Sequence, residues 1–268
     1  MSAARRWITL TTDFGLDSPY VAQMKAVLAR RAPQAAVVDL SHNIGPQDVR
    51  QAAILLHDSC FWFPPETVHV AVVDPGVGTE RRLLAARLKD QWFVGPDNGV
   101  ISLWAERDPP ELVVVLDRPE YWNRDVSSTF HGRDIMAPVA AHLVNGVSPL
   151  ELGSPTNTWQ RFPWPRPQWH HGFVEAHVLL VDHFGNLLTD LTQAMVAQRR
   201  AHLVGGSLPG GQSFRVVRTY GEAPAGTLVG LFGSQGRFEV AVVQGNAAAD
   251  YQLAAGDVVR VEWHCGDE

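Results

Sequence analysis

The stretch WITLTTDFGLDSPYVAQMKAVLARRAPQAAVVDL, residues 7–40, decides the fold of the first half of the chain. Its β-rich run 7–11 predicts a strand, its helical pattern at 19–31 predicts a helix, and its apolar run 36–40 predicts a second strand. The same alternation of short β-rich runs and helical stretches continues to about residue 150. Such alternation favours an α/β layer with a mostly parallel sheet.

The remaining expected elements follow the same two periodicities. Further strands are expected at residues 68–73, 83–88, 92–94 and 112–116, and further helices at 47–58, 99–106 and 135–145. Asp13 and Asp74 then fall at the carboxyl ends of strands, where open α/β sheets place ligands.

From residue 173 onward the pattern changes to short alternating runs separated by Gly/Pro turns. These runs lie at 175–181, 214–217, 238–243 and 258–263, and the glycine-rich GGSLPGG at 205–211 is typical of a hairpin turn. The pattern predicts a small all-β, barrel-like C-terminal domain at 173–268, after an α/β N-terminal domain at 1–153. The proline- and tryptophan-rich segment 154–172 is expected to be an extended linker.

Composition excludes several classes of function. The chain has 268 residues, 46% of them hydrophobic, and a net charge of -6, which argues against a nucleic-acid partner. No apolar run approaches the ~20 residues needed to span a bilayer, and residues 1–7 lack the apolar core of a signal peptide, so we expect a cytoplasmic protein with no membrane partner. Cys60 and Cys265 fit neither a disulfide framework nor a zinc site, and no metal site is predicted.

Four glycine-flanked motifs carry the candidate chemistry: TTDFG at 11–15, DPGVGTER at 74–81, FHGRD at 130–134 and DHFGN at 182–186. Each has a structural alternative. Asp13 can be a turn or capping residue, the glycines after Asp74 can form a tight loop, and His131 can be an ordinary hydrogen-bonded histidine. A structural loop does not explain Arg81, and the combination of carboxylates, arginine and histidine in turns favours an active site.

These motifs, together with SHNIGPQDV, GPDNG and GNAA, resemble those of the S-adenosyl-L-methionine (SAM) hydroxide adenosyltransferases. Members of that family are adenosine-forming hydrolases related to SAM-dependent fluorinases and chlorinases. The matching motifs extend from Thr11 to about Ala248. The resemblance implies a catalytic set of Asp74, Arg81 and His131, with SAM as substrate and no cofactor.

The resemblance also implies a set of substrate-binding residues. Asp13 would hold the ribose hydroxyls, Asp182 and Asn186 the amino-acid end, and Tyr220 would stack on the adenine. The full implied set is Asp13, Phe130, Asp182, Asn186, Tyr220, Ser234, Asn246 and Ala247, the last three near the adenine. The adenine-side run is GSQGR where the family has N-S-x-G-Y, so Gly233 and Arg237 depart from the pattern. The family further implies a homotrimer with each site between the N-terminal domain of one subunit and the C-terminal domain of its neighbour.

The residue chemistry suits hydrolysis at a sulfonium. The cationic sulfur leaves without a general acid, so the difficulty lies in presenting water, whose pKa is about 15.7, in line with the ribose C5′. Arg81 can stabilise developing hydroxide, and Asp74 or His131 can take the proton. Two alternatives remain: a halogenase acting at the same carbon, and a non-catalytic SAM or adenosine sensor. Gly132 stands where the halogenating relatives have serine, which favours water as the nucleophile.

Overall fold

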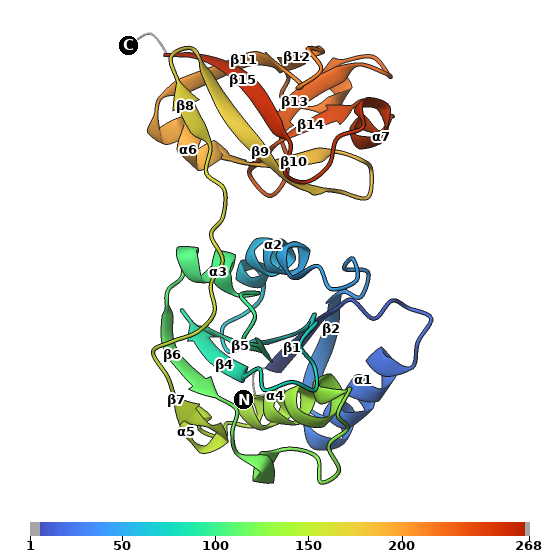
Figure 1. Cartoon of the computed structure of the whole chain (residues 1–268), viewed down its shortest axis with the longest axis vertical. Helices are drawn as coiled ribbons and strands as arrows, with labels where there is room; N and C mark the ends of the chain where they lie inside the picture. Colours follow the sequence, from blue (N-terminus) through green and yellow to red (C-terminus); the bar gives the residue numbers. More distant parts are fainter. Residues whose placement is uncertain (1–5, 266–268) are drawn as a thin grey trace, which may run out of the picture. The chain divides into compact units, whose positions relative to one another are not determined.

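The computed structural model describes residues 6–265 and divides the chain between Pro163 and Trp164 into two compact units (Figure 1). The division falls inside the stretch expected to be a linker. The predicted combination of an α/β unit followed by a small β-barrel is confirmed. The expectation about a signal peptide concerns in part residues 1–5, which lie outside the described residues. Among residues 6–265, no helix has the length and apolarity to cross a bilayer.

The N-terminal unit is built on a seven-stranded sheet in the order β2-β1-β3-β5-β4-β6-β7. The strands are β1 Arg6–Thr12, β2 Ala35–Ser41, β3 Val68–Val72, β4 Leu83–Leu88, β5 Gln91–Pro96, β6 Pro110–Val115 and β7 Ser154–Pro155. The pairings from β2 to β5 are parallel and those from β5 to β7 are antiparallel. The sheet is therefore mixed, which corrects the expectation of a mostly parallel one. Only Lys89 and Asp90 separate β4 from β5, and so short a connection can join only antiparallel neighbours.

Helices cover both faces of this sheet. They are α1 Tyr20–Arg31, α2 Val49–Ser59, α3 Ser102–Arg107, α4 Ala137–Val144 and α5 Pro149–Leu152, with the short helices η1 Cys60–Trp62 and η2 Pro119–Tyr121 and the π-helix η3 Gly132–Met136. Met24 and Leu28 of α1 and Val139 of α4 share one core with inward residues of β1 and β3. Leu56 of α2 and Trp104 of α3 belong to a second core on the other face. The layered arrangement buries the sheet and leaves its edges for loops.

The C-terminal unit is a closed barrel of seven strands in the order β10-β14-β13-β12-β11-β15-β9, with β9 paired back to β10 and β8 added beside β9. The strands are β8 Gln168–His170, β9 Phe173–Val181, β10 Leu187–Thr192, β11 Ala201–Ser207, β12 Ser213–Val216, β13 Leu228–Phe232, β14 Arg237–Val242 and β15 Val258–Cys265, with helices α6 Gln193–Gln198, η4 Tyr220–Glu222 and α7 Ala247–Tyr251. The GGSLPGG run joins the antiparallel β11 and β12, as predicted for a hairpin. Closure pairs both edges of the barrel sheet, so its turns and outer face are available for binding.

Candidate active site

The carboxyl ends of two neighbouring strands bring the first motifs together. β1 and β3 run parallel, with Thr12 in register with Val72, so Asp13 and Asp74 follow adjacent strands at the same edge of the sheet. Asn98 donates from its Nδ2 to the Val73 carbonyl at 2.8 Å, which fixes the chain just before Asp74. The edge is the one where α/β sheets hold ligands, as the sequence predicted.

Arg81 folds back onto Asp74. Its Nε lies 2.8 Å from Oδ1 and 2.9 Å from Oδ2 of Asp74, and its Nη2 lies 2.5 Å from Oδ2. Both side chains are mostly buried, at 10% and 5% exposure. A fork of this kind fixes the plane of the guanidinium as well as its charge. Among residues 6–265, Nη1 of Arg81 has no hydrogen-bond partner, so its two N–H donors are not used by these residues.

His131 contacts the same guanidinium, and we call the group formed by Asp74, Arg81 and His131 the fork. Arg81 Nη2 donates to His131 Nδ1 at 2.9 Å, and because an arginine only donates, Nδ1 must be the unprotonated nitrogen. Burial and the Arg81 charge lower the pKa of His131 below 6.5, against the opposite effect of Asp74 and Asp134. The ring is therefore neutral at pH 7, with its proton on Nε2. The structure thus brings together all three residues predicted as catalytic.

Three glycines make room for this arrangement. A Cβ on Gly76 would lie 2.9 Å from Cδ of Arg81, and one on Gly78, where φ is +80°, would lie 2.7 Å from the Ser128 carbonyl oxygen. A Cβ on Gly132 would lie 2.9 Å from Cγ1 of Val72. The glycines of both motifs are thus required by close packing of the two loops, which holds Arg81 against Asp74 and seats His131 beside the end of β3.

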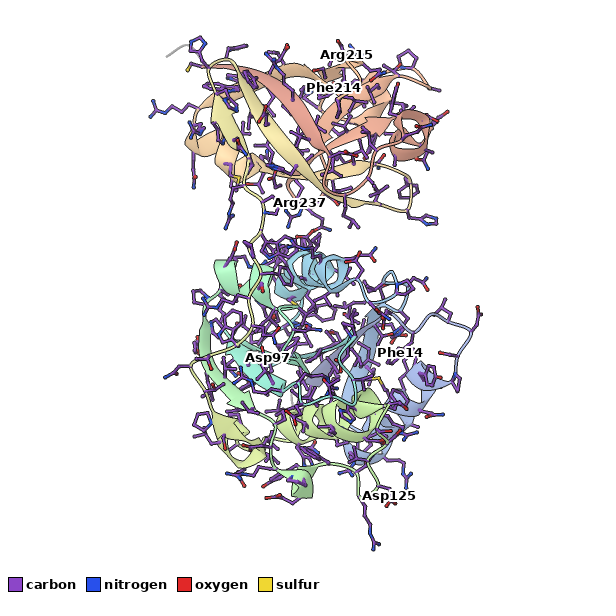
Figure 2. All side chains as sticks on the ribbon, in the orientation of Figure 1. Phe14, Asp97, Asp125, Phe214, Arg215 and Arg237 are labelled. Carbon is purple, nitrogen blue, oxygen red and sulfur yellow. The ribbon has the colours of Figure 1, made fainter. Side chains whose placement is uncertain are left out.

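Asp13 and Phe130 have different surroundings. Asp13 is partly exposed, and its Oδ2 accepts a hydrogen bond from the Gln47 backbone N–H at 2.8 Å. Phe130 is only 7% exposed and packs edge-on against Phe14 and Tyr20, with ring centroids 5.6 and 5.2 Å apart. Figure 2 labels Phe14, one of the two rings that pack against Phe130. Asp13 is therefore open to a ligand, whereas Phe130 belongs to the hydrophobic core, and the substrate roles of both stay predictions.

A cavity of ≈ 700 Å³ in the C-terminal unit collects the second group of predicted residues. Asp182, Asn186, Tyr220 and Ser234 all line it. Asp182 Oδ1 accepts from the backbone N–H groups of Phe184 and Asn186 at 2.9 and 2.8 Å, and its Oδ2 accepts from Nδ2 of Asn186 at 2.9 Å. The DHFGN motif is thus the β9–β10 turn, closed by its own aspartate, with Asp182 and Asn186 at the cavity wall.

Tyr220 leads to a residue that sequence reasoning missed. Its hydroxyl lies 3.5 Å from Nδ2 of Asn186 and donates to Oε1 of Glu239, which also lines the cavity. Glu239 is 6% exposed, and burial raises its pKa above 4.5. A signal was present, because a glutamate inside the apolar run FEVAVV of a strand is unusual. Asp182, Asn186, Tyr220 and Glu239 form one hydrogen-bonded wall.

Asn246 and Ala247 do not line this cavity. Asn246 caps α7, its Oδ1 accepting from the Ala249 N–H at 2.8 Å, and it occupies the space left by the missing side chain of Gly185. Ala247 is fully buried in the barrel core. Their neighbours Gln244 and Gly245 are the residues of this segment that border the cavity. The contact of Asn246 and Ala247 with adenine therefore stays a prediction, and the structure gives both a structural role.

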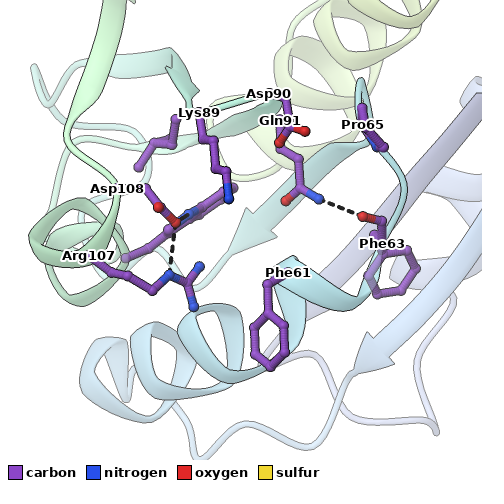
Figure 3. A pocket seen from close by; sticks show the side chains of 10 residues that line it. Phe61, Phe63, Pro65, Lys89, Asp90, Gln91, Arg107 and Asp108 are labelled. Carbon is purple, nitrogen blue, oxygen red and sulfur yellow. Dashed lines mark hydrogen bonds and ion pairs between the residues drawn. The ribbon is translucent and has the colours of Figure 1, made fainter. Parts of the chain in front are cut away.

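A second cavity, of ≈ 520 Å³, lies in the N-terminal unit away from these residues (Figure 3). It is lined by Phe61, Phe63, Pro65, Leu88, Lys89, Asp90, Gln91, Trp104, Arg107 and Asp108. Gln91 donates to the Phe63 carbonyl at 2.8 Å across its wall. The cavity borders the amino-terminal ends of β3 and β5, the edge of the sheet opposite Asp13 and Asp74. It contains no residue predicted for the site.

An α/β unit with an Asp–Arg–His fork at its ligand edge, followed by a β-barrel with an acidic cavity, defines a two-domain protein equipped for chemistry on a small polar molecule. The chain belongs to the SAM hydroxide adenosyltransferase family. The model of that family's N-terminal domain matches residues 8–153, and the model of its C-terminal domain matches residues 176–260.

Two relatives that match over nearly the full length are (R)-S-adenosyl-L-methionine hydrolases by name. The (R)-S-adenosyl-L-methionine hydrolase of Thermus thermophilus is 43% identical, covering 96% of this chain and 99% of its own. The enzyme of the same name from Salinispora arenicola is 40% identical, covering 97% and 98%. A crystal structure of an uncharacterized conserved protein from Thermotoga maritima superposes with a TM-score of 0.89 at 33% identity, over 97% of this chain and 100% of that one. Fluorinases are more distant, at 24% to 28% identity.

Proposed function

We propose that the protein hydrolyses SAM to adenosine and L-methionine by in-line attack of water on the ribose C5′. The observation that carries the proposal is the Asp74–Arg81–His131 fork at the ligand edge of the sheet, in a chain that belongs to this family. The C5′–O bond forms as the C5′–S bond breaks, the electron pair passes to sulfur, and methionine leaves as a neutral thioether. One proton from water goes to the protein and then to solvent.

The fork supplies the positive charge and the proton acceptor that water needs in order to act as a nucleophile. Asp74 fixes the plane of the Arg81 guanidinium, so Nη1, which has no hydrogen-bond partner among residues 6–265, presents a fixed positive charge to developing hydroxide. His131 Nδ1 already accepts from Arg81, so the neutral ring has no free lone pair for a proton. We therefore assign Asp74 as the proton acceptor and His131 as the residue that orients Arg81. Asp13 binds the ribose diol, because one carboxylate can accept from two hydroxyls.

The halogenase alternative meets a packing obstacle at Gly132. The halogenating relatives have serine there, and here a Cβ would lie 2.9 Å from Cγ1 of Val72, closer than carbon atoms pack. A serine at 132 would require Val72 to move. The absence of a hydroxyl at this position supports water rather than halide as the nucleophile.

The two groups of residues serve one substrate in this proposal. Asp13, Asp74, Arg81 and His131 belong to the N-terminal unit, and Asp182, Asn186, Tyr220 and Ser234 to the C-terminal unit. We propose a homotrimer in which the adenosyl group contacts the first set in one subunit and the second set in its neighbour. What supports this assignment is that each unit carries only part of the predicted set. The expected cytoplasmic location stays a prediction, as does the absence of a nucleic-acid partner.

Turnover in isotopically labelled water tests the proposal. Purified protein is incubated with SAM in H₂¹⁸O, with and without a chelator, and products are identified by mass spectrometry. We expect ¹⁸O in the 5′-hydroxyl of adenosine, unlabelled methionine, and the same rate with chelator. Methylthioadenosine, S-adenosylhomocysteine, or no product would reject hydrolysis. Dependence of turnover on added chloride or fluoride, with a halogenated nucleoside as product, would replace it by halogenation.

A further inference from the structure

We infer that Glu239 recognises the charge on the sulfur of the substrate: its carboxylate makes the barrel cavity prefer an adenosyl compound with a cationic centre there over one that is neutral there and has the same shape. The inference rests on the proposed function for the identity of the ligand. The contacts from which it is argued do not depend on whether the protein turns over SAM. It assigns a binding role to a residue that belongs to none of the recognised motifs.

The position of Glu239 is set by the barrel. Phe238 and Val240 point into the barrel core, so the alternation along β14 turns Glu239 to the outer face, where it borders the cavity. Its Oε1 accepts from the Tyr220 hydroxyl. Within the part of the chain that the structure describes, Oε2 has no hydrogen-bond partner. A side chain more than nine-tenths buried thus presents one unpaired carboxylate oxygen to the cavity.

The neighbouring hairpin leaves room for this carboxylate. Gly233 begins the β13–β14 turn, and a Cβ there would lie 2.3 Å from Oε2 of Glu239. Any larger residue at 233, such as the asparagine of the family pattern, would push the Glu239 carboxylate from its place. The departure from that pattern at Gly233 is therefore coupled to the orientation of Glu239. The run GSQGR and the buried glutamate form one local structure.

The cavity wall carries uncompensated negative charge. Among residues 6–265, neither Asp182 nor Glu239 forms an ion pair with a lysine, arginine or histidine. Arg218 lines the cavity, but its side chain is 94% exposed and it pairs with Glu222 at 3.0 Å. Burial and the charge of Asp182 hold the pKa of Glu239 above its usual value. A buried acid of this kind gains most from a cation that arrives with the ligand.

The charge on sulfur is what distinguishes SAM from its close neutral analogue. S-adenosylhomocysteine has the same nucleoside and amino-acid ends but a neutral thioether, whereas SAM carries a positive sulfonium. A negative cavity wall favours the sulfonium and gives the thioether no corresponding gain. Tyr220 contributes by holding the Glu239 carboxylate in one orientation, since its hydroxyl donates to Oε1.

Equilibrium binding tests the inference without turnover. Dissociation constants are measured by calorimetry for S-adenosylhomocysteine and for a stable amine analogue that carries an ammonium in place of the sulfonium methyl. The variant is Glu239→Gln, which keeps the shape and a hydrogen bond to Tyr220. Asp190→Asn is the matched control, because Asp190 is a buried carboxylate of the same barrel, paired with His177 at 2.8 Å and outside the cavity.

We expect the parent and Asp190→Asn to prefer the amine analogue, and Glu239→Gln to lose about 10- to 100-fold of that preference while binding S-adenosylhomocysteine as before. An unchanged ratio would overturn the inference. Equal weakening of both ligands would show that Glu239 recognises the nucleoside and not the charge. If the parent binds both analogues with the expected ratio but does not turn over SAM, the proposed function fails and the charge preference stands.

Discussion

Replacing Arg81 by lysine separates the charge of the fork from its shape. Arginine at this position contacts both oxygens of Asp74 through Nε, and contacts Oδ2 of Asp74 and Nδ1 of His131 through Nη2. A lysine ammonium keeps the positive charge but cannot reach both partners in one plane. Loss of two charge-assisted hydrogen bonds, each about 1.5 to 3 kcal/mol, corresponds to about 10²- to 10⁴-fold in rate.

The assay is steady-state formation of adenosine, with kcat and KM measured separately. We expect Arg81→Lys to lower kcat by this factor and to leave KM nearly unchanged, because the fork acts on the nucleophile. Arg82→Lys is the matched control. Arg82 donates through Nε and Nη2 to Oδ2 of Asp97, labelled in Figure 2, at 2.9 and 2.5 Å, and no hydrogen bond joins it to Asp74 or His131. If both variants retain the parent kcat, the fork has no catalytic role and the reasoning is wrong.

Three further predictions concern pH and assembly. Because burial and Arg81 lower the pKa of His131 below 6.5, the acid limb of kcat should have its midpoint below pH 6.5, and a limb that persists in His131→Asn would contradict this. His69 is buried with a pKa of about 4, so between pH 6.5 and 4 the unfolded state binds its proton and the folded state does not. The free energy of unfolding should therefore fall by up to about 3 kcal/mol as the pH is lowered from 6.5 to 4. Urea unfolding at several pH values measures this dependence, and His69→Gln should lack the part of it that His69 causes. Equal slopes of the free energy of unfolding against pH in parent and variant would refute the prediction. Arg81→Ala and Asp182→Ala, each inactive alone, should regain activity when their subunits exchange, and no recovery after proven exchange would place the whole site in one subunit.

Strands and helices with a clear period were predictable from the sequence. β4 lies at the predicted residues 83–88, and α1 begins at Tyr20, one residue from the predicted start. The strand β10 was missed, because it carries buried polar residues such as Thr189 and Asp190, which hide its apolar period. β13 was missed since Gly230 interrupts it, and Phe214 fills the space a side chain would take there. Packing between strands, which no local pattern records, made these segments strands.

The proposed catalytic set was predictable as residue types, because turns rich in glycine kept Asp74, Arg81 and His131 recognisable. What the sequence could not give was their protonation. Whether His131 Nδ1 donates or accepts depends on a contact across 50 positions of the chain. Glu239 was not predicted because its position at the cavity depends on contacts with Tyr220 and Gly233, which come from other turns. Asn246 was predicted from a motif to contact adenine, and what the structure shows is that it caps α7.

The orientation of the His131 side chain depends on the number of residues in the π-helix η3, which directly follows it. The Ala137 N–H bonds to the Gly132 carbonyl, five residues back, so this turn holds one residue more than an α-helical turn would. Removing a single residue from 132–136 would restore an α-helix and rotate His131 by about 100° relative to α4. The ring would leave Arg81, although every chemical group would still be present. Insertions and deletions here should therefore be tolerated far less than exchanges among apolar side chains, and the length of this segment is itself a constraint on how the sequence can evolve.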